Sequence, residues 1–223
     1  MGAADVIWLD GGVPASARFD DPYFSLAGGL DEARHVYLAG NGLPGRLCDG
    51  FAVAELGFGT GLNLLALWLA WRATGRAGTL RYTGFEAFPM RADEIARALA
   101  PFPEAAAAAP PLLAQWQAGA RRLELPGLVA EVIEGDARTT LPAWEGFAGA
   151  WFLDGFSPAK NPEMWGAGLM AAVAAHTAPG GTFATYTAAG HVRRALQAAG
   201  FAVSRCPGFG AKRHMSRGVK DTA

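Results

Sequence analysis

An aspartate stands where a short apolar run ends, in the segment WFLDGFSPAKNPEMW that covers residues 151–165. Three apolar residues begin this segment as they would begin a buried strand, and Asp154 follows them directly. A carboxylate at such a strand end can orient a substrate amine and accept its proton. Because a lone carboxylate beside three apolar residues has no evident structural task, we expect Asp154 to be catalytic.

Aromatic and polar side chains follow Asp154 in the same segment. The rings of Phe156 and Trp165 could stack on a nucleobase, and Lys160 and Asn161 could hold a phosphate or the edge of a base. The alternative is that the aromatics pack in the core and Lys160 is solvated, and for Trp165 core packing is the favoured interpretation. We therefore expect Phe156, Lys160 and Asn161 to bind the substrate.

A glycine-rich loop, ELGFGTGLN at residues 55–63, lies between a predicted strand and a predicted helix. Glycines let the backbone turn sharply and approach a ligand closely. The dinucleotide fingerprint G-x-G-x-x-G fails in both registers, because Leu62 and Leu64 stand where its last glycine should be. The remaining pattern, E-x-G-x-G-x-G, is typical of the first loop of S-adenosylmethionine (SAM) methyltransferases. The expected cofactor contacts in this loop are Glu55, Gly57, Gly59, Thr60, Gly61 and Asn63.

Two further acids end predicted strands. Glu86 lies roughly 25 residues beyond the glycines, where an acid can accept both hydroxyls of a ribose. Asp136, with Ala137 beside it, follows a third strand and could take the amino group of an adenine. The alternative is that both acids only cap helices. Three such strand ends in order favour a nucleoside-binding site.

Short apolar runs alternate with helical periodicity from residue 51 onward, which predicts an α/β fold with a mainly parallel, Rossmann-like sheet. The predicted strands cover 51–56, 80–85, 128–133, 149–154 and 182–187, with 201–206 and 211–219 as a closing antiparallel hairpin. The predicted helices cover 62–72, 91–100, 166–177 and 191–199, with a helical insertion at 101–111. Ligands bind beyond the carboxyl ends of such strands, so Asp154 should open into the same crevice as the glycine loop.

Residues 1–50 do not follow this alternation. Glycines punctuate short segments there, and the stretch FDDPYF at 19–24 is dense in aromatics and acids. We expect a small N-terminal extension, which could include a β-hairpin, packed on a SAM-dependent methyltransferase domain at 51–223. It is too short for an independent core.

The composition is that of an ordinary globular protein, with 51% apolar and 17% charged residues among 223. No apolar run reaches the ~18 residues that a membrane span needs, and the N-terminus lacks the features of a secretory signal. Cys48 and Cys206 are far apart and predict free thiols in a reducing compartment, so we expect a cytoplasmic protein. Four scattered histidines give no reason to expect a metal.

The net charge of −1 conceals an asymmetry along the chain. Residues 191–223 hold seven basic residues and one acid, which gives +6, whereas the remaining residues hold twelve basic and nineteen acidic residues, which gives −7. This distribution predicts one positive face, suited to a polyanion. A solvated helix and tail would produce the same count.

Several segments resemble the methyltransferase half of the bifunctional tRNA wobble-uridine enzyme (MnmC) and its stand-alone counterpart (MnmD). They are WFLDGFSPAKNPEMW, ELGFGTGLN, GFEAFPM and TYTAAGHVRRALQAAGF, with FDDPYFS, GLDEARHVYLAGNGLP and GFGAKRHM resembling the terminal segments of that family. The resemblance spans nearly the whole chain, and DGFSPAKNPEMW is its most specific part.

The resemblance implies a class I SAM-dependent methyltransferase with a mostly parallel seven-stranded sheet. It implies N-methylation of 5-aminomethyl-(2-thio)uridine at wobble position 34, in the anticodon loop of tRNA, to the 5-methylaminomethyl form. The glycine loop, Glu86 and Asp136 would then hold SAM, and Asp154 would face the amine. The residues implied to meet the tRNA backbone are Arg193, Arg194, Lys212 and Arg213.

The chain departs from that family in two places. It carries no further glycine fingerprint after residue 61, so the FAD-dependent activity of the bifunctional enzyme is not expected, and residues 101–127 match only loosely. Two alternatives stay open, a methyltransferase for a small-molecule amine and a catalytically silent RNA-binding module. The missing dinucleotide fingerprint makes an oxidoreductase the weakest interpretation.

Overall fold

The computed structural model describes residues 2–25 and 28–221. Its centre is an eight-stranded sheet in the order β10-β11-β9-β8-β4-β5-β7-β6. The strands are β4 (Ala52–Leu56), β5 (Leu80–Glu86), β6 (Arg122–Leu125), β7 (Leu128–Glu134), β8 (Ala148–Leu153), β9 (Thr177–Thr185), β10 (Phe201–Pro207) and β11 (His214–Lys220). The five strands β7, β5, β4, β8 and β9 run parallel, and the other three pair antiparallel at the two edges. This confirms the predicted α/β fold.

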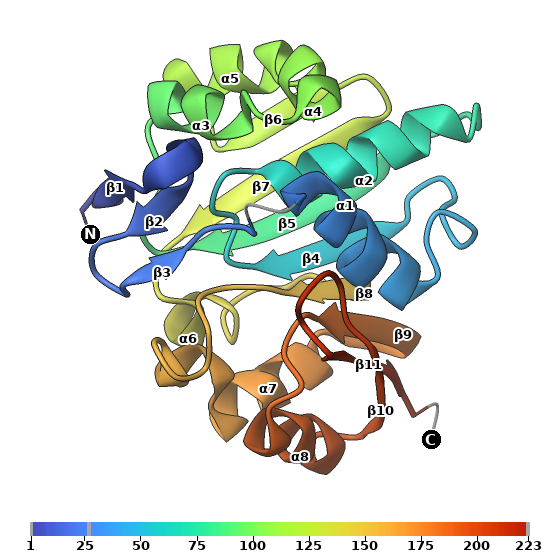
Figure 1. The fold of residues 1–223 in the computed structure, drawn as a ribbon. Helices are drawn as coiled ribbons and strands as arrows, with labels where there is room; N and C mark the ends of the chain where they lie inside the picture. The colour runs from blue at the N-terminus through green and yellow to red at the C-terminus, as the bar shows by residue number, and fades with distance from the viewer. Residues whose placement is uncertain (1, 26–27, 222–223) are drawn as a thin grey trace.

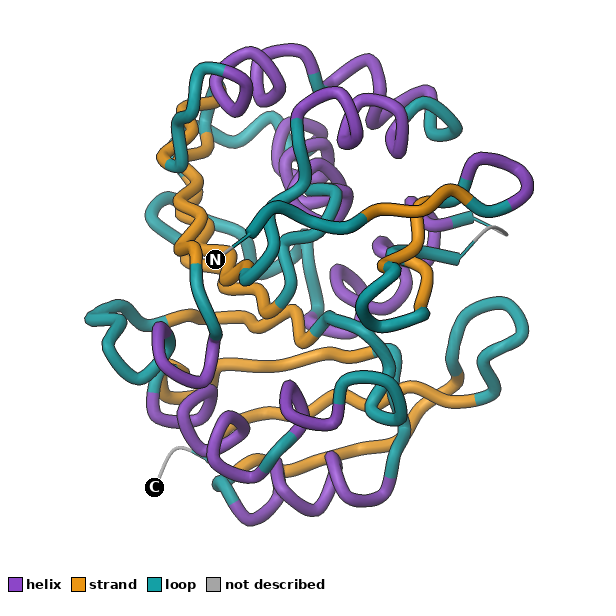
Figure 2. Tube along the Cα trace, turned by 90° about the vertical axis from the view of Figure 1, so that its left-hand side faces the viewer, coloured by secondary structure: helices purple, strands orange, loops and turns teal. Residues whose placement is uncertain are grey.

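Helices cover both faces of this sheet (Figures 1 and 2). On one side lie α2 (Leu62–Ala73), α3 (Ala92–Leu99), α4 (Pro103–Ala108) and α5 (Pro110–Gln117), and on the other α6 (Ala137–Thr140), α7 (Ala167–Ala175) and α8 (Gly190–Ala198). The alternation of β8 explains the two cores: Phe152 packs with the α2 side and Trp151 with the α7 side. No helix of the described residues is long and apolar enough to cross a bilayer.

The order of the strands reverses between β4 and β8. The chain runs outward from β4 through β5 to β7 on one side, and returns to place β8 on the other side of β4. In an open α/β sheet the crevice beyond such a reversal is where ligands bind. Gly57 and Asp154 are the first residues after these two strands, so the topology alone brings them together.

The structure adds detail that the sequence pattern lacked. The sheet has eight strands rather than seven, because the four residues of β6 turn back at Pro126 and pair with β7. Strand β9 begins at Thr177 rather than 182 and includes the expected Pro-Gly-Gly stop, with a register shift in its pairing to β8. The insertion at 101–111 is helical, as α4 and the start of α5. Cys48 and Cys206 are free thiols.

The N-terminal residues form a three-stranded antiparallel sheet followed by short helical turns. The strands are β1 (Val6–Trp8), β2 (Pro14–Ser16) and β3 (Asp21–Pro22), with a 3-10 turn (Asp10–Gly12) between the first two. They precede α1 (Gly29–Ala33), a π-helical turn (Arg34–Leu38) and a second 3-10 turn (Ala39–Asn41). Leu30, Val36 and Leu38 pack in the same core as α2. We propose the division at residue 50 on this basis, as an extension without a core of its own.

Candidate active site

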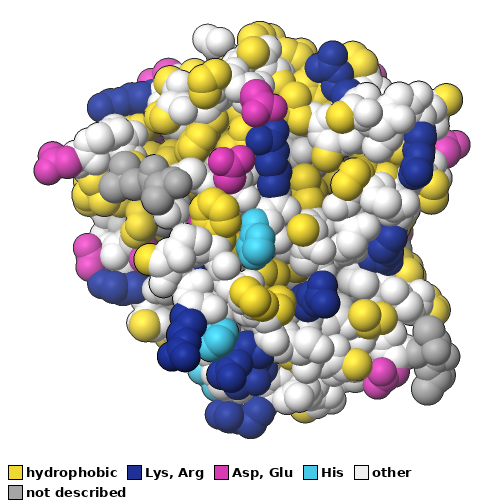
Figure 3. Space-filling view, turned by 45° about the vertical axis from the view of Figure 1, so that its right-hand side comes forward, with side chains coloured by type: hydrophobic (Ala, Val, Ile, Leu, Met, Phe, Trp, Pro, Cys, Tyr) yellow, Lys and Arg dark blue, Asp and Glu magenta, His cyan; other side chains and the backbone are white. Residues whose placement is uncertain are grey.

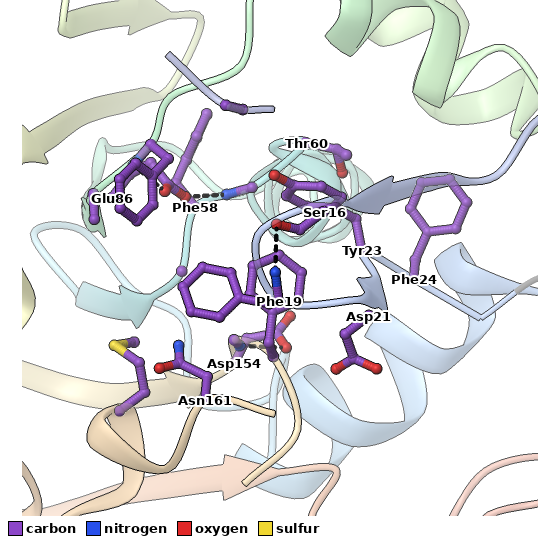
Figure 4. A pocket seen from close by; sticks show the side chains of 18 of the residues that line it. Ser16, Phe19, Asp21, Tyr23, Phe24, Phe58, Thr60, Glu86, Asp154 and Asn161 are labelled. Carbon is purple, nitrogen blue, oxygen red and sulfur yellow. Dashed lines mark hydrogen bonds between the residues drawn. The ribbon is translucent and has the colours of Figure 1, made fainter. Parts of the chain in front are cut away.

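A cavity of about 1060 Å³ opens at the carboxyl ends of β4, β5, β7 and β8 (Figure 4). Its lining includes the glycine loop, Glu86, Asp136 and Asp154, together with residues of the N-terminal strands. Ligand pockets typically measure roughly 300–1,000 Å³. The cavity therefore has room for a cofactor and part of a second molecule.

The glycine loop lies against the segment that carries Asp154. Gly57 has φ +80°, in the region that favours glycine, and a Cβ there would lie 3.2 Å from the backbone N and Cα of Gly155. Gly57, Gly59 and Thr60 line the cavity, as predicted for a loop that approaches a ligand. A Cβ at Gly61 would lie 3.0 Å from the Phe58 ring, and Gly61 is the N-cap residue of α2. A contact from Gly61 to the cofactor stays a prediction.

Glu86 is the last residue of β5 and faces the cavity. Its two carboxylate oxygens accept hydrogen bonds from the backbone N–H groups of Gly59 and Phe88, each at 2.8 Å. Burial raises the pKa of this carboxyl, and the backbone donors oppose the rise. Each oxygen keeps a second lone pair, so the arrangement suits the predicted pair of ribose hydroxyls.

Asp136 lines the cavity and also caps a helix, which was the alternative interpretation. One carboxylate oxygen accepts from the backbone N–H of Arg138 at 2.9 Å, at the start of α6. The hydrogen-bonded Arg138 side chain, itself paired with Glu163 at 2.8 Å, lowers the pKa of Asp136. The buried Ala137 lines the cavity beside it. A contact from Asp136 to an adenine amino group stays a prediction.

Asp154 is the first residue after β8 and its carboxylate is held on two sides (Figure 4). One oxygen accepts from the Gly155 N–H at 2.8 Å, and the other accepts from the Asn63 side-chain amide at 2.8 Å. Burial raises the pKa of Asp154 to about 6, against the opposing effect of its hydrogen-bond donors and of Lys212. A carboxylate with a pKa near the working pH suits proton transfer.

The structure places Glu55 outside the cavity, which corrects its predicted role. Its side chain is fully buried, and its oxygens are hydrogen-bonded to the Tyr82 hydroxyl and to the Asn63 amide. Asn63 does line the cavity, but its amide nitrogen is engaged by both Glu55 and Asp154. Glu55 therefore cannot touch a ligand directly.

The segment after Asp154 is tied to the turn between β2 and β3. Phe156 stacks on Phe19 with ring centroids 4.7 Å apart, and Tyr23 meets its edge at 5.0 Å. Lys160 forms an ion pair with Asp20, and the Ser157 N–H donates to Asp21 at 2.7 Å. A base could not stack on the covered face of Phe156 unless Phe19 moved, and Lys160 would have to exchange its exposed ion pair with Asp20 to hold a phosphate.

The two remaining residues of that segment, Asn161 and Trp165, have different environments. Asn161 lines the cavity, as expected for a substrate contact. Trp165 is 2% exposed and its indole N–H donates to the Phe156 carbonyl at 2.9 Å, so the core-packing interpretation is confirmed. Sequence reasoning missed the N-terminal residues that roof the cavity, of which Phe19, Asp21 and Tyr23 are the clearest. The dense FDDPYF stretch was the only signal for them.

The predicted tRNA-contacting residues divide into two groups. Lys212 lines the cavity, where its ammonium pairs with Glu32 at 2.7 Å and lies 4.3 Å from the centre of the Tyr186 ring. Arg193, Arg194 and Arg213 pair with no carboxylate of the described residues. A contact from Lys212 or from these arginines to the tRNA backbone stays a prediction.

Three arginines gather around His214, where Arg205 joins Arg193 and Arg213. Burial and then the charges of these three side chains lower the pKa of His214. Figure 3 shows lysine and arginine side chains gathered beside histidines on the lower part of one face. We call Arg193, Arg205 and Arg213 the arginine cluster.

A family described as "S-adenosyl-L-methionine-dependent methyltransferase" matches residues 103–221, more than half of the chain. The chain belongs to this methyltransferase family. Its residues fit the cofactor that the family uses, because Gly57 and Gly59 line the cavity and Glu86 offers acceptors at the next strand end.

Curated relatives of the methyltransferase are longer than this chain. It is 49% identical over 230 residues to the "tRNA 5-methylaminomethyl-2-thiouridine biosynthesis bifunctional protein MnmC" of Caulobacter sp. (strain K31), covering 97% of this chain and 38% of that protein. It is 45% identical to the protein of the same name from Chromobacterium violaceum, covering 96% and 34%. The chain thus spans less than two fifths of these relatives.

Two solved structures share the fold of the methyltransferase. The structure of MnmC2 from Aquifex aeolicus has a TM-score of 0.77 at 23% identity, covering 100% of this chain and 71% of that one. Spermidine synthase from Thermotoga maritima has a TM-score of 0.57 at 13% identity, covering 99% and 69%. Both likenesses support the fold.

Proposed function

We propose that the protein transfers the methyl group of SAM to the amine of 5-aminomethyl-(2-thio)uridine at tRNA wobble position 34. The product is the 5-methylaminomethyl form, which makes it a tRNA (5-aminomethyl-2-thiouridylate) methyltransferase. The observation that carries the proposal is Asp154, a carboxylate with a pKa of about 6 at the edge of a cavity shared with the glycine loop. The identity of the substrate is inferred from the relatives, which are named for this tRNA modification.

The chain's own residues would perform three tasks. The glycine loop and Glu86 hold the nucleoside of SAM, whose sulfonium activates the methyl carbon. Asp154, ionised above pH 6, accepts a proton from the substrate ammonium and leaves the nitrogen lone pair free. SAM would supply the methyl carbon to the nitrogen and leave as the thioether, and the proton would pass from Asp154 to solvent. Alignment and exclusion of water are the protein's main contributions.

The roof formed by the N-terminal strands would serve the exclusion of water. Phe19 and Phe156, which both line the cavity, stack with ring centroids 4.7 Å apart, and Asp20 and Asp21 fix the turn to the segment after β8. A small molecule or a single flipped nucleotide fits a cavity roofed in this way, whereas a folded duplex does not.

The experiment that tests the function uses labelled SAM, the purified protein and tRNA from cells that accumulate the 5-aminomethyl wobble base. We expect label in 5-methylaminomethyluridine after digestion to nucleosides. Measurable SAM binding without label in any tRNA nucleoside would contradict the tRNA substrate, and small amines would then be screened as acceptors.

The arginine cluster predicts where the tRNA backbone binds. Replacing Arg193, Arg205 and Arg213 together by alanine should raise the Kd for tRNA by roughly 10-fold or more. The plot of log Kd against the logarithm of the salt concentration should become less steep, by about 0.7 in slope for each lost phosphate contact. SAM binding should stay unchanged, because none of the three lines the cavity. The measurement is tRNA binding at several salt concentrations.

A matched triple variant controls for the loss of charge alone. Arg72, Arg81 and Arg122 are exposed and lie on α2, β5 and β6. Their replacement by alanine should leave the salt slope nearly unchanged. Equal slopes for the two triple variants would place the tRNA surface elsewhere.

A further inference from the structure

Glu55 is a fully buried carboxyl group that the proposed mechanism does not use. A buried carboxyl is costly unless its oxygens have hydrogen-bond partners. Both have one here, the Tyr82 hydroxyl on Oε2 and the Asn63 amide on Oε1 at 2.5 Å. These contacts explain how Glu55 is tolerated, but an apolar residue in the same strand would need none of them.

One nitrogen atom connects Glu55 to the candidate proton acceptor. Asn63 Nδ2 donates to Glu55 Oε1 at 2.5 Å and to Asp154 Oδ2 at 2.8 Å. The two carboxyl oxygens therefore lie no more than about 5.3 Å apart, the sum of these bonds. A side-chain amide has two N–H groups, so one is available for each carboxyl. This sharing fixes the rotation of the Asn63 amide.

The other titratable groups around Asp154 come from separate elements. Tyr37 of the π-helical turn, Tyr186 after β9 and Lys212 of the β10–β11 loop face it from the cavity side. Glu32 faces Lys212 and compensates its charge. Burial and the nearby Asp154 charge raise the pKa of Glu55 well above its usual range.

We propose that Glu55 is a positioning residue that holds the Asp154 carboxylate toward the cavity through the Asn63 amide, without touching cofactor or substrate. The inference rests on the proposed function only in taking Asp154 as the proton acceptor. Without an acceptor at position 55, the Asn63 amide can rotate away from Asp154. Asp154 then loses one of its hydrogen-bond donors and its fixed direction.

Two substitutions of similar size separate positioning from packing. Glu55→Gln keeps an oxygen for Asn63 and gives the Tyr82 hydroxyl an N–H to accept, whereas Glu55→Leu fills the space without an acceptor. We expect kcat of Glu55→Gln within about 3-fold of wild type and kcat of Glu55→Leu lowered by roughly 10-fold or more, both with the KM for SAM within about 3-fold. Equal kcat in the two variants, or a large rise in the KM for SAM in both, would overturn the proposal.

A second measurement does not depend on the methyl acceptor. The Asp154 carboxylate can be titrated by ¹³C NMR and assigned by its absence in Asp154→Asn. We expect a midpoint near pH 6 in wild type and in Glu55→Gln, and a higher midpoint in Glu55→Leu, because an N–H donor to the charged form is lost. An unmoved midpoint in Glu55→Leu contradicts positioning, even if tRNA is methylated.

Asn63→Ala provides the same test if Glu55→Leu does not fold. Removal of the bridging amide should raise the Asp154 midpoint, and adding Glu55→Gln to it should change kcat no further. A wild-type midpoint in Asn63→Ala would overturn the proposal. A shifted midpoint without label in tRNA would instead contradict the proposed function and leave the positioning role standing.

Discussion

Replacing Asp154 by asparagine is expected to lower the rate of methyl transfer by roughly 100-fold or more while SAM affinity stays within a few-fold. Asparagine has nearly the same shape and can still accept the Gly155 N–H, but it cannot take a proton from an ammonium group. The cofactor contacts proposed for the glycine loop and Glu86 do not involve this side chain. The measurement is single-turnover transfer from labelled SAM, beside an independent SAM titration.

The pH dependence of the same reaction distinguishes proton transfer from mere contact. The pKa of Asp154 is raised to about 6, so the protonated, inactive form predominates below that value. Wild-type turnover should therefore fall about tenfold per pH unit below 6 and level off above it, and the residual rate of Asp154→Asn should lack this limb. Near-normal turnover in the variant would remove Asp154 from the mechanism.

The strand ends of the site were predictable because each joins an apolar run to a polar residue or a glycine. Glu86 and Asp154 follow runs of this kind, and the fold class then dictates that the carboxyl ends of parallel strands meet at one edge. The pairing of β4 with β8 brings Gly57 to Gly155, which are almost a hundred residues apart. Here a local pattern and a general topological rule were sufficient.

Glu55 shows what a local pattern cannot supply. Strand alternation puts Glu55 and Val53 on one face of β4, but it does not say whether the carboxyl reaches the cavity. The outcome depends on the register with β5, where Glu55 lies opposite Gly84 and diagonal to Tyr82. The Tyr82 hydroxyl donates a hydrogen bond to the Glu55 carboxyl within the sheet layer, and Glu55 does not line the cavity.

The roof of the cavity depends on contacts between distant segments. Phe156 is a candidate for stacking on a base and Phe19 belongs to a stretch dense in aromatics, but nothing in either segment indicates that the two rings stack on each other. The same holds for Lys160, whose partner Asp20 belongs to the N-terminal turn. The strand β6 was missed for a simpler reason, since four residues are too few for a reliable alternation.

Replacing Gly57 by alanine is expected to lower turnover by roughly 10-fold or more and to weaken SAM binding, beyond any loss of stability. A φ of +80° costs an L-residue about 1–2 kcal/mol, and the added Cβ would lie 3.2 Å from the backbone N and Cα of Gly155. Backbone atoms cannot rotate away as a side chain would. The Gly155 N–H also donates to Asp154, so a displaced Gly155 moves the proton acceptor with it.

Gly75→Ala is the matched control, because Gly75 has φ +65° and a Cβ there would have no atom within 4 Å. It carries the same backbone cost without the contact, so its Tm should fall by roughly 2–4 °C per kcal/mol while turnover and SAM affinity remain those of wild type. The measurements for both variants are the Tm and the turnover at a temperature well below the Tm. If Gly57→Ala lost only stability, the loops after β4 and β8 would tolerate an extra methyl group, and their close contact would matter for folding rather than for the chemistry at Asp154.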